Sequence, residues 1–540
     1  MSQIDGAALV GQTLVALGVK AAFGVVGSGN FVATDALVRA GATYVAARHE
    51  SGAIGMADGH YRATGECAVA SVHQGPGLTN ALTALTEASK SRVPMVVISG
   101  ATSAGMTASN FFIDQSALTR AAGAVPVAID RPDTVAQDTV RAYRTAVVMQ
   151  RPVVLNMPLD VQASVVTQVD IAHEPTLHTV VTPSTAAVAE LAQRLDEARR
   201  PVLIGGRGAW RSDARTSLLQ LADRTGAMLA TTAVANGLFT GHARNIGISG
   251  GFSSPRAVRE LEGADLLVGF GCSFTHWTTR DGSIFKGSTV VQVDTDASSI
   301  AGNSRIDLGL LGDARATSEA LLRHLGEGGS SAPSGEYPPT DDAEDLAEGD
   351  GQIHPLRFTQ ALEHLLPAER TVVLDGGHFI GWPAMHLSVP DPSGFLFSSA
   401  GFQSIGLGLG MSIGAARARP DRMTVLAIGD GGFAMSIAEL ETLVRLRSPI
   451  LVAIYDDAAY GAEVHHFQEH GTGMELVQFP DTDFARIARG AGADAVTVRC
   501  LEDLGPVKEW LAQPQGPLVV DAKIMPDVVG PWAARDFMGH

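Results

Sequence analysis

The sequence predicts an α/β protein with three domains, each built on a mostly parallel sheet flanked by helices. Short, continuous apolar runs are typical of strands that are covered on both faces. Such runs span residues 95–99, 152–157, 201–205, 266–271, 289–293, 424–428 and 450–455. Helical patterns alternate with these runs, and 60 glycines suit the many tight turns that the alternation requires. A length of 540 residues is enough for about three domains of roughly 150 residues each.

Two segments divide the chain. Residues 163–183 follow the apolar run at 152–157, and residues 326–351 are rich in Gly, Ser, Pro, Asp and Glu without a periodic apolar pattern. We therefore predict three domains joined by a flexible linker. They are an N-terminal domain at 1–165, a middle domain at 184–326, the linker at 327–353 and a C-terminal domain at 354–540.

Charge and cysteine usage exclude several classes of function. A net charge of −18 makes nucleic acid and anionic membrane surfaces unexpected partners. No apolar run reaches membrane-spanning length, and the N-terminus has no basic region with a long apolar core. Cys67, Cys272 and Cys500 lie far apart without metal-binding spacing. We therefore expect a reducing, cytoplasmic setting.

A glycine turn and an acidic pair mark a candidate metal site. Gly429-Asp430-Gly431-Gly432 follows one apolar run, and Asp456-Asp457 follows the next, with Asp457 27 positions after Asp430 (457 − 430). A right-handed β-α-β unit brings the carboxyl ends of both strands together, where open α/β sheets bind ligands. Two carboxylates beside glycine amides suit Mg²⁺ that holds a phosphate group. The alternative for an isolated GDG is a glycine turn with solvated aspartates.

The helix between these two strands has its own predicted start and end. Ser436 and Glu439 form the S-x-x-E pattern of a capping box. Apolar residues then recur at helical spacing, and Arg447-Ser448-Pro449 ends the helix.

Residues 428–461 resemble the thiamine diphosphate motif, in which GDG is followed, after a helix and a strand, by Asn-Asn. Here Asp456-Asp457 replaces Asn-Asn. The resemblance implies that Mg²⁺ is bound by Asp430, Asp457 and the backbone carbonyl of Ala459. It also implies that Gly432 and Phe433 donate amides to the diphosphate, where a helix start favours anions.

Arg48-His49-Glu50 resembles the segment that carries the activating glutamate in the superfamily of acetolactate synthase, pyruvate decarboxylase and benzoylformate decarboxylase. The resemblance implies that Glu50 binds the aminopyrimidine ring and favours the imino tautomer, which removes the C2 proton of the thiazolium. It makes the N-terminal domain the pyrimidine-binding (PYR) domain and the C-terminal domain the diphosphate-binding (PP) domain. Taken alone, Glu50 would be a carboxylate at a helix N-terminus.

Further positions match the acetolactate synthase-like pattern. Ile405 would be the bulky residue under the bent cofactor, and the carbonyl of Gln403 would face the pyrimidine amino group. The loop that begins at Asp375 would hold the diphosphate. The other cofactor-binding residues that the resemblance implies are Asn80, Gly377, His378, Phe379, Gly429, Gly431, Tyr460 and Gly461.

The PYR and PP domains are predicted to be relatives of each other. The interval from glycine turn to proline is 19 residues in the first (94 − 75) and 20 in the second (449 − 429). The resemblance implies that the cofactor lies between the PYR domain of one subunit and the PP domain of another. We therefore expect a homodimer or homotetramer with active sites at the subunit interface.

Four side chains bear on the substrate. His73 stands where benzoylformate decarboxylase-like enzymes carry a catalytic histidine, and Glu463 aligns with the catalytic glutamate of pyruvate decarboxylase-like enzymes. His465 could reach the same entrance to the active site. Gln115 matches a glutamine that acetolactate synthases place near the substrate. Together with Glu50 these are the predicted catalytic residues. The alternative for a histidine here is a polar surface residue.

The resemblance implies one general chemistry and leaves the outcome open. The thiazolium accepts the electrons released when a 2-oxo acid loses CO₂, and the enamine or carbanion then takes a proton or attacks an acceptor aldehyde or ketone. The leading hypothesis is such a decarboxylase or carboligase. The alternatives are a lyase or hydrolase that cleaves a diketone or acyloin without decarboxylation, an NAD-type dehydrogenase, and a silent cofactor-binding partner.

The middle domain carries weaker signals. Residues 247–251 and 271–276 lack the arginine and the acidic pair expected of an FAD site, so catalytic FAD is not expected. The strand at 291–296 matches the family pattern, and a bound nucleotide stays open. Residues 201–208 end in a GGxG turn, which by itself is a weak dinucleotide signal.

Overall fold

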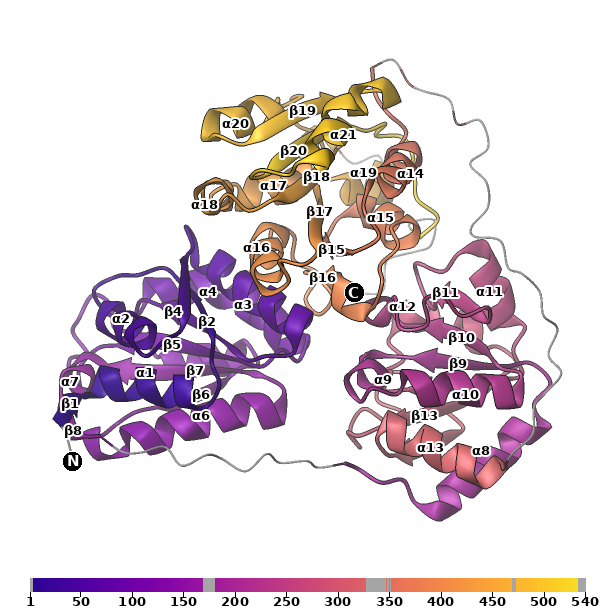
Figure 1. Cartoon of the computed structure of the whole chain (residues 1–540), viewed down its shortest axis with the longest axis horizontal. Coiled ribbons are helices and arrows are strands. Elements are labelled where there is room, and N and C mark those ends of the chain that lie inside the picture. Colours follow the sequence, from indigo (N-terminus) through magenta and orange to yellow (C-terminus); the bar gives the residue numbers. More distant parts are fainter. Residues whose placement is uncertain are drawn as a thin grey trace.

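Three sheets, each with helices on its faces, form three lobes in the computed structural model of this chain (Figure 1). The structure describes residues 3–168, 180–326, 346, 349, 351–468 and 473–532. The predicted fold class is confirmed, because every strand pairing described within the three six-stranded sheets is parallel. Most of the predicted linker at 327–353 lies outside the described residues.

The PYR domain contains the first of these sheets, in the order β3-β2-β4-β5-β7-β6. Its strands are β2 (Ala21–Gly24), β3 (Thr43–Ala46), β4 (Ala68–Val72), β5 (Met95–Ala101), β6 (Val125–Ala128) and β7 (Pro152–Pro158). Its helices are α1 (Gly6–Ala16), α2 (Phe31–Arg39), α3 (Glu50–Thr64), α4 (Pro76–Lys90), α5 (Gln115–Ala121), α6 (Val135–Met149) and α7 (Leu159–Gln162). Two further short strands, β1 (Gln3–Asp5) and β8 (Val165–Thr167), pair antiparallel. The second of them falls within the segment expected to be a linker.

The middle domain has the strand order β11-β10-β9-β12-β13-β14, in which the order reverses between β9 and β12. Its strands are β9 (Pro201–Gly205), β10 (Met228–Thr231), β11 (Asn245–Ile248), β12 (Leu266–Phe270), β13 (Thr289–Asp294) and β14 (Leu308–Leu311). Its helices are α8 (Thr185–Glu197), α9 (Arg207–Arg211), α10 (Arg215–Thr225), α11 (Pro255–Glu262), α12 (His276–Thr279) and α13 (Ala314–Leu325).

The PP domain repeats the PYR topology strand for strand, in the order β16-β15-β17-β18-β20-β19. Its strands are β15 (Arg370–Leu374), β16 (Phe395–Phe397), β17 (Met423–Gly429), β18 (Ile450–Asp456), β19 (Asp494–Val498) and β20 (Leu518–Lys523). Its helices are α14 (Pro355–Leu365), α15 (Gly381–His386), α16 (Gly408–Ala418), α17 (Asp430–Ser436), α18 (Glu439–Leu446), α19 (Gly461–Phe467), α20 (Phe484–Ala491) and α21 (Gly505–Ala512).

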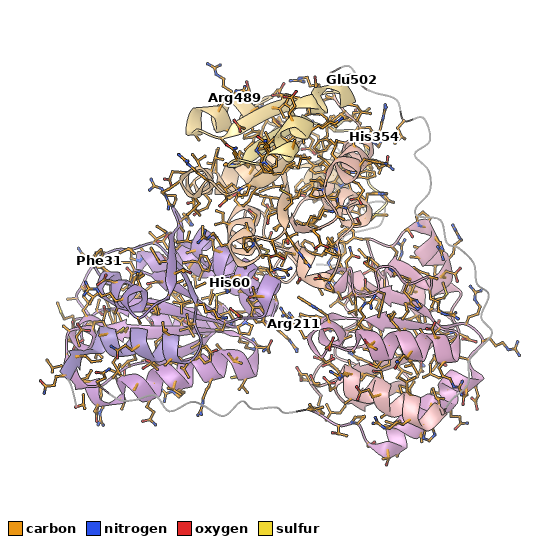
Figure 2. All side chains as sticks on the ribbon, in the orientation of Figure 1. Phe31, His60, Arg211, His354, Arg489 and Glu502 are labelled. Carbon is orange, nitrogen blue, oxygen red and sulfur yellow. The ribbon has the colours of Figure 1, made fainter. Side chains whose placement is uncertain are left out.

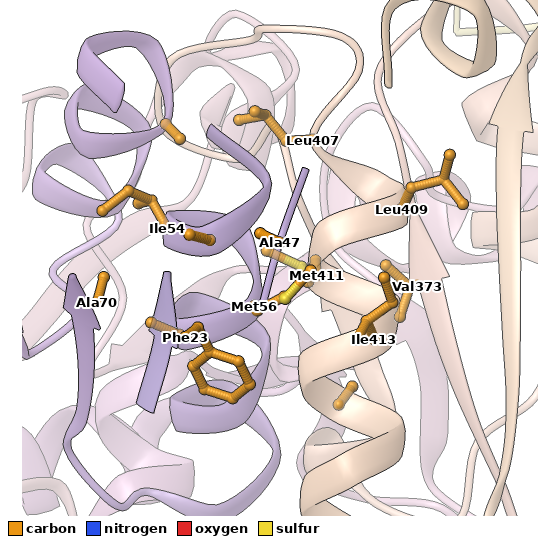
Figure 3. Close-up of a cluster of buried hydrophobic side chains, with 14 of the residues drawn as sticks. Phe23, Ala47, Ile54, Met56, Ala70, Val373, Leu407, Leu409, Met411 and Ile413 are labelled. Atoms are coloured by element: carbon orange, nitrogen blue, oxygen red, sulfur yellow. The ribbon is translucent and has the colours of Figure 1, made fainter. Parts of the chain in front are cut away.

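The PYR and PP domains share one hydrophobic core, in which α3 packs on α16 (Figure 3). Met56 and Met411 lie at this contact and are fully or almost fully buried. Glycines let the two backbones approach. A Cβ added at Gly59 would lie 2.1 Å from the Met411 carbonyl oxygen, and one at Gly414 would lie 1.9 Å from that of Met56. The two domains are therefore held at a fixed spacing that no larger side chain at these glycines would permit.

The predicted capping box is wrong. Ser436 is the last residue of α17 rather than an N-cap, and its hydroxyl donates to the Gly432 carbonyl oxygen at 2.8 Å. Glu439 starts α18, and its carboxylate accepts from backbone amides of the PYR domain. The local pattern failed because a partner from another domain binds this carboxylate more favourably than the helix's own amides.

No helix among the described residues is both long and apolar enough to cross a membrane.

Candidate active site

The acidic pair lies where the sequence predicts, at the carboxyl ends of two neighbouring strands. Gly429 is paired in register with Tyr455, so the turns after β17 and β18 lie side by side. Asp430 is 7% exposed and begins α17. Burial, together with the nearby Asp457 carboxylate, raises the pKa of Asp430 to about 8. Burial likewise raises the pKa of Asp457 to about 7, so both carboxyls lack a counter-charge.

Glycines crowd this acidic pair. A Cβ added at Gly431 would lie 2.7 Å from the Tyr460 ring, and one at Gly461 would lie 2.2 Å from Oδ2 of Asp457. The described residues contain no group of three or more His, Cys, Asp or Glu side chains that could hold a metal ion. A pair of carboxylates does fit Mg²⁺, which takes few protein ligands and completes its shell with carbonyl, phosphate and water oxygens.

Asp456 does not belong to this acidic pair, although it is adjacent in sequence. Its Oδ2 accepts a hydrogen bond from Lys523 Nζ at 2.6 Å, and both side chains are almost fully buried. The two residues are register partners on β18 and β20. Lys523 also pairs with Asp481 and Asp521, so it offsets the Asp456 charge only in part. Asp457 is the residue of the Asp-Asp pair that lies beside Asp430.

The segment at 398–408 is held by Asp375, which is fully buried. This carboxylate accepts from Ser398 Oγ at 2.8 Å and from the Gly406 amide at 2.7 Å. Ile405, two residues after Gln403, lies next to the glycine turns, because a Cβ added at Gly376 would lie 3.1 Å from Ile405 Cγ2. Gln403 has a φ of +58°, an unusual backbone conformation of the kind that concentrates at binding sites.

Two predicted histidines lie in contact beside the acidic turn, with their ring planes tilted by 46°. The ring centroids of His378 and His465 are 4.1 Å apart. Burial, and then the neighbouring His465, lowers the pKa of His378 to about 4. His378 Nε2 accepts from the Gly530 amide at 3.2 Å, and Trp532 Nε1 donates to the His378 carbonyl oxygen at 2.9 Å. The last described segment of the chain therefore covers this histidine.

A second group of polar side chains lies at the carboxyl end of the PYR sheet. Asn80 Nδ2 donates to Glu50 Oε2 at 3.0 Å. A Cβ added at Gly77 would lie 3.5 Å from Glu50 Oε1 and 3.1 Å from His73 Cβ, so His73 adjoins the glutamate. The structure thus brings together Glu50, His73 and Asn80, three residues that the sequence assigned to the site.

Ser28 joins this group and was missed by the sequence reasoning. His73 Nδ1 lies 2.7 Å from the Gln74 carbonyl oxygen, which can only accept, so Nδ1 carries the proton. His73 Nε2 is then free to accept from Ser28 Oγ at 3.3 Å. The available signal was the Gly27-Ser28-Gly29 turn shortly after an apolar run, which is uninformative without a partner.

Gln115 is buried and fully occupied within the PYR domain. Its Oε1 accepts from the Gly75 amide at 2.9 Å, and its Nε2 donates to Asn156 Oδ1 at 2.7 Å and to the Gly100 carbonyl oxygen at 2.9 Å. This geometry holds the glycine turn before α4. The predicted contact of Gln115 with substrate stays a prediction.

The PYR and PP groups are separate within one chain. Among the described residues, no hydrogen bond joins Glu50 or His73 to Asp430 or Asp457. Glu463 is exposed on the first turn of α19. The two groups are therefore separate half-sites, and a site shared between two subunits, as the resemblance implies, stays a prediction.

The glycine turn of the middle domain is closely packed. A Cβ added at Gly206 would lie 2.1 Å from the Gly271 carbonyl oxygen, so the turn is packed against its neighbour. Arg207 donates to the Ser91 carbonyl oxygen of the PYR domain. Arg211 lies between the two domains with its guanidinium 4.7 Å from the Tyr61 ring centroid (Figure 2). Both arginines therefore contact the PYR domain, and the question of a nucleotide in the middle domain stays open.

The fold and the two half-sites define a three-domain α/β protein. A pair of aspartates lies on one of its two related domains, and a group of Glu50, His73 and Asn80 lies on the other. Comparison with protein families finds three matching models. The "Thiamine pyrophosphate enzyme, N-terminal TPP binding domain" matches residues 4–119, the central domain matches 188–321, and the C-terminal TPP binding domain matches 375–522. The chain belongs to the thiamine pyrophosphate enzyme family.

Relatives in sequence agree with this assignment, and a solved structure shares the fold. A sulfoacetaldehyde acetyltransferase of Alcaligenes xylosoxydans xylosoxydans is 27% identical over 92% of this chain and 88% of its own length. An acetolactate synthase of Mycobacterium avium is 28% identical over 92% of this chain and 83% of its own length. The structure of benzoylformate decarboxylase from Polynucleobacter necessarius superposes with a TM-score of 0.83 at 21% identity, covering 97% of this chain and 99% of that one.

Proposed function

We propose that this protein is a Mg²⁺- and thiamine diphosphate-dependent enzyme that decarboxylates a 2-oxo acid and passes the resulting carbanion to a proton or to an acceptor carbonyl. The observation that carries the proposal is the division of the site. A buried, uncompensated pair of aspartates lies on one domain, and a hydrogen-bonded Glu50–Asn80 pair lies beside His73 on its relative.

The residues of the PP domain would hold the cofactor's polar end. Asp430 and Asp457 would release their protons to solvent when Mg²⁺ binds, and the carbonyl of Ala459 would be the third protein ligand. Amides of Gly432 and Phe433 would face the diphosphate, and so would the loop of Gly377, His378 and Phe379. Ile405 would fill the space beside Gly376, where it supports the cofactor.

The residues of the PYR domain would bind and transfer protons. Glu50 would share a proton with the aminopyrimidine, and Asn80 would hold the carboxylate in place through its amide. His73, with its Nε2 free to take a proton from Ser28 or from substrate, would move protons at the reacting carbon. When bound, the cofactor supplies an electron sink for the pair released as the bond to CO₂ breaks.

Two outcomes for the carbanion follow from different residues. The His73–Ser28 pair favours protonation and release of an aldehyde, since it offers a proton carrier at the PYR side. The named relatives, an acetyltransferase and an acetolactate synthase, favour transfer to an acceptor. Cleavage of a diketone or acyloin without decarboxylation is the second candidate, because the same residues would serve it.

The test is product analysis by mass spectrometry. The protein is mixed with thiamine diphosphate, Mg²⁺ and a panel of 2-oxo acids, with and without aldehyde or ketone acceptors. CO₂ with an aldehyde alone marks a decarboxylase, and a new acyloin or acetohydroxy acid marks a carboligase. No turnover of any 2-oxo acid contradicts the leading proposal and favours the lyase.

We also propose that the enzyme works in the cytoplasm as a homodimer or homotetramer, with each active site between two subunits. Support comes from the separation of Glu50 and Asp430 into two groups within one chain. Light scattering at catalytic concentration tests the assembly. Mixing two inactive variants, Glu50→Gln and Asp430→Ala, should restore part of the activity if the site is shared.

A further inference from the structure

Two buried glutamates connect the PYR and PP domains, and the mechanism above uses neither. Glu439 on α18 is 2% exposed, and its Oε1 accepts from the amides of Arg48 at 3.0 Å and His49 at 2.9 Å. Glu87 on α4 is 1% exposed and accepts from the amides of Gly401 at 2.9 Å and Phe402 at 2.6 Å. Each carboxylate lies on one domain and binds backbone of the other.

The two contacts are reciprocal. In each domain the glutamate lies on the helix or helix pair that follows the third strand of the sheet, β4 or β17. Each binds the loop after the second strand of the other sheet, which leads from β3 to α3 or from β16 to α16. Because the two sheets have the same strand order, the contacts are related by the same symmetry that relates the domains.

Both contacts are tightly packed, and each includes a glycine at which a larger side chain would clash. A Cβ added at Gly52 would lie 2.2 Å from Glu439 Oε1, and one at Gly401 would lie 2.9 Å from the Ser91 amide nitrogen. Each carboxylate also accepts from a hydroxyl of its own domain. Thr442 donates to Glu439 Oε2 at 2.7 Å, and Ser91 donates to Glu87 Oε1 at 2.6 Å. Buried carboxylates that accept several donors form strong hydrogen bonds with fixed geometry.

The segments that are held lead directly into the candidate site. His49 immediately precedes Glu50, and Phe402 immediately precedes Gln403. We propose that Glu439 and Glu87 are positioning residues, which set the two cofactor-facing segments from across the domain interface. Glu439 fixes Glu50, and Glu87 fixes the segment of Gln403 and Ile405. This inference rests on the proposed function for its cofactor.

Glu439 is tested by the rate at which bound thiamine diphosphate exchanges its C2 proton for deuterium, measured by NMR on the full chain with Mg²⁺. Glu439→Ala removes the carboxylate acceptor, and Glu439→Asp moves it away from the amides because the side chain is shorter. Each variant should slow exchange about 10- to 100-fold, because small displacements of a reacting group have effects of that size. Cofactor affinity should stay within about threefold. Glu439→Gln keeps an acceptor oxygen and should restore most of the rate.

The matched control is Glu509→Ala on α21, an exposed glutamate of the same domain. It should leave the exchange rate unchanged. Unslowed exchange in Glu439→Ala or Glu439→Asp would overturn the assignment. If the alanine variant does not fold, the contrast between the Asp and Gln variants decides, because only the Gln variant keeps the reach of the side chain.

Substitution of Glu87 should weaken cofactor binding and leave the removal of the C2 proton unchanged. Glu87→Asp is expected to weaken thiamine diphosphate binding about tenfold, as the loss of charge-assisted hydrogen bonds would. Its C2 exchange rate at saturation should stay near that of the wild type. Thr83→Ala, exposed on the same helix, is the control. Unchanged cofactor affinity in Glu87→Asp would overturn the role of Glu87.

Amide hydrogen exchange of the cofactor-free chain separates this inference from the proposed function. The amides of residues 48 and 49 should be protected in the wild type and exposed in Glu439→Asp, and those of 401 and 402 should respond likewise to Glu87→Asp. Absence of this protection would overturn the inference without any cofactor present. Failure of the wild type to bind thiamine diphosphate would instead contradict the proposed function.

Discussion

The PYR and PP domains share one strand order, yet their third strands end in different turns. In the PYR domain the turn is Gly75-Pro76-Gly77, and one helix of 15 residues follows. In the PP domain the helix begins at Asp430 and is divided into α17 of 7 residues and α18 of 8 residues. The same scaffold therefore presents a glutamate with an amide and an imidazole on one domain, and a pair of aspartates on the other. Topology fixes where a site forms, and the turn fixes its chemistry.

The largest expected effect comes from removing the acid function of the PYR domain. Glu50→Gln cannot share a proton with the aminopyrimidine, so the C2 exchange of bound thiamine diphosphate should slow by about 10³-fold. Cofactor affinity should change little, because the proposed metal and diphosphate contacts lie on the PP domain. Proton exchange by NMR and calorimetric titration measure the two quantities. A fast exchange rate in this variant would remove Glu50 from its assigned role.

The second-largest effect is expected from a substitution in the acidic turn of the PP domain. Asp430→Ala removes one of two carboxylate ligands and should weaken Mg²⁺-dependent cofactor binding by at least about 100-fold. The fold should survive, since the substitution also removes an uncompensated buried carboxyl. Titration calorimetry and circular dichroism check these outcomes. Asp494→Ala, an exposed aspartate of the same domain, serves as the control. Unchanged affinity would contradict the metal site.

Sequence reasoning succeeded where the signal is local. The turn at Asp430 and the strand before Asp457 belong to one β-α-β unit, whose handedness and register are general rules, so their proximity could be predicted. It failed where a side chain binds a partner that is distant in sequence. Glu439 matches a helix-capping pattern but binds amides 391 and 390 positions away, and nothing in its neighbourhood distinguishes the two uses.

The same limit explains Ser28 and Gln115. Ser28 belongs to the candidate site through its contact with His73, 45 positions later, and one sequence does not pair them. Gln115 matches a family position, yet its buried amide is occupied by Asn156 and by the turn at Gly75. Residue type and position identify candidates, whereas hydrogen-bond partners determine which of them face a ligand.

The third effect distinguishes proton transfer from carboligation. His73→Ala should lower the rate of aldehyde release about 10- to 100-fold, because a positioned proton carrier contributes at least that much. Ser28→Ala should have a smaller effect in the same direction, since its hydroxyl only supports His73 Nε2. Carboligation with an added aldehyde should be affected less. Product ratios by mass spectrometry are the measurement, and equal losses in both products would contradict a role specific to protonation.

The smallest effect is on stability, and it depends on pH. Burial raises the pKa of Asp430 from 3.8 to about 8, so between these values the folded chain binds a proton that the unfolded chain has released. The stability of the cofactor-free protein should therefore fall as pH rises through this range. Asp430→Asn cannot ionise and should be more stable than the wild type at pH 8, by about 1–2 kcal/mol.

That advantage of the asparagine variant should shrink as pH falls towards 3.8 and below, where the unfolded wild-type carboxyl also becomes protonated. Mg²⁺ should reduce the stability advantage of the variant at pH 8. The cation stabilises the wild type by binding both ionised carboxylates, whereas the variant offers it only one. Denaturant titrations across the pH range, with and without Mg²⁺, measure the difference. Stability curves that run parallel for the two proteins would show that Asp430 is not held in its neutral form. In that case the ionised Asp430 would not lower the stability of the folded protein. The acidic turn would then have no unfavourable free energy for a bound cation to offset.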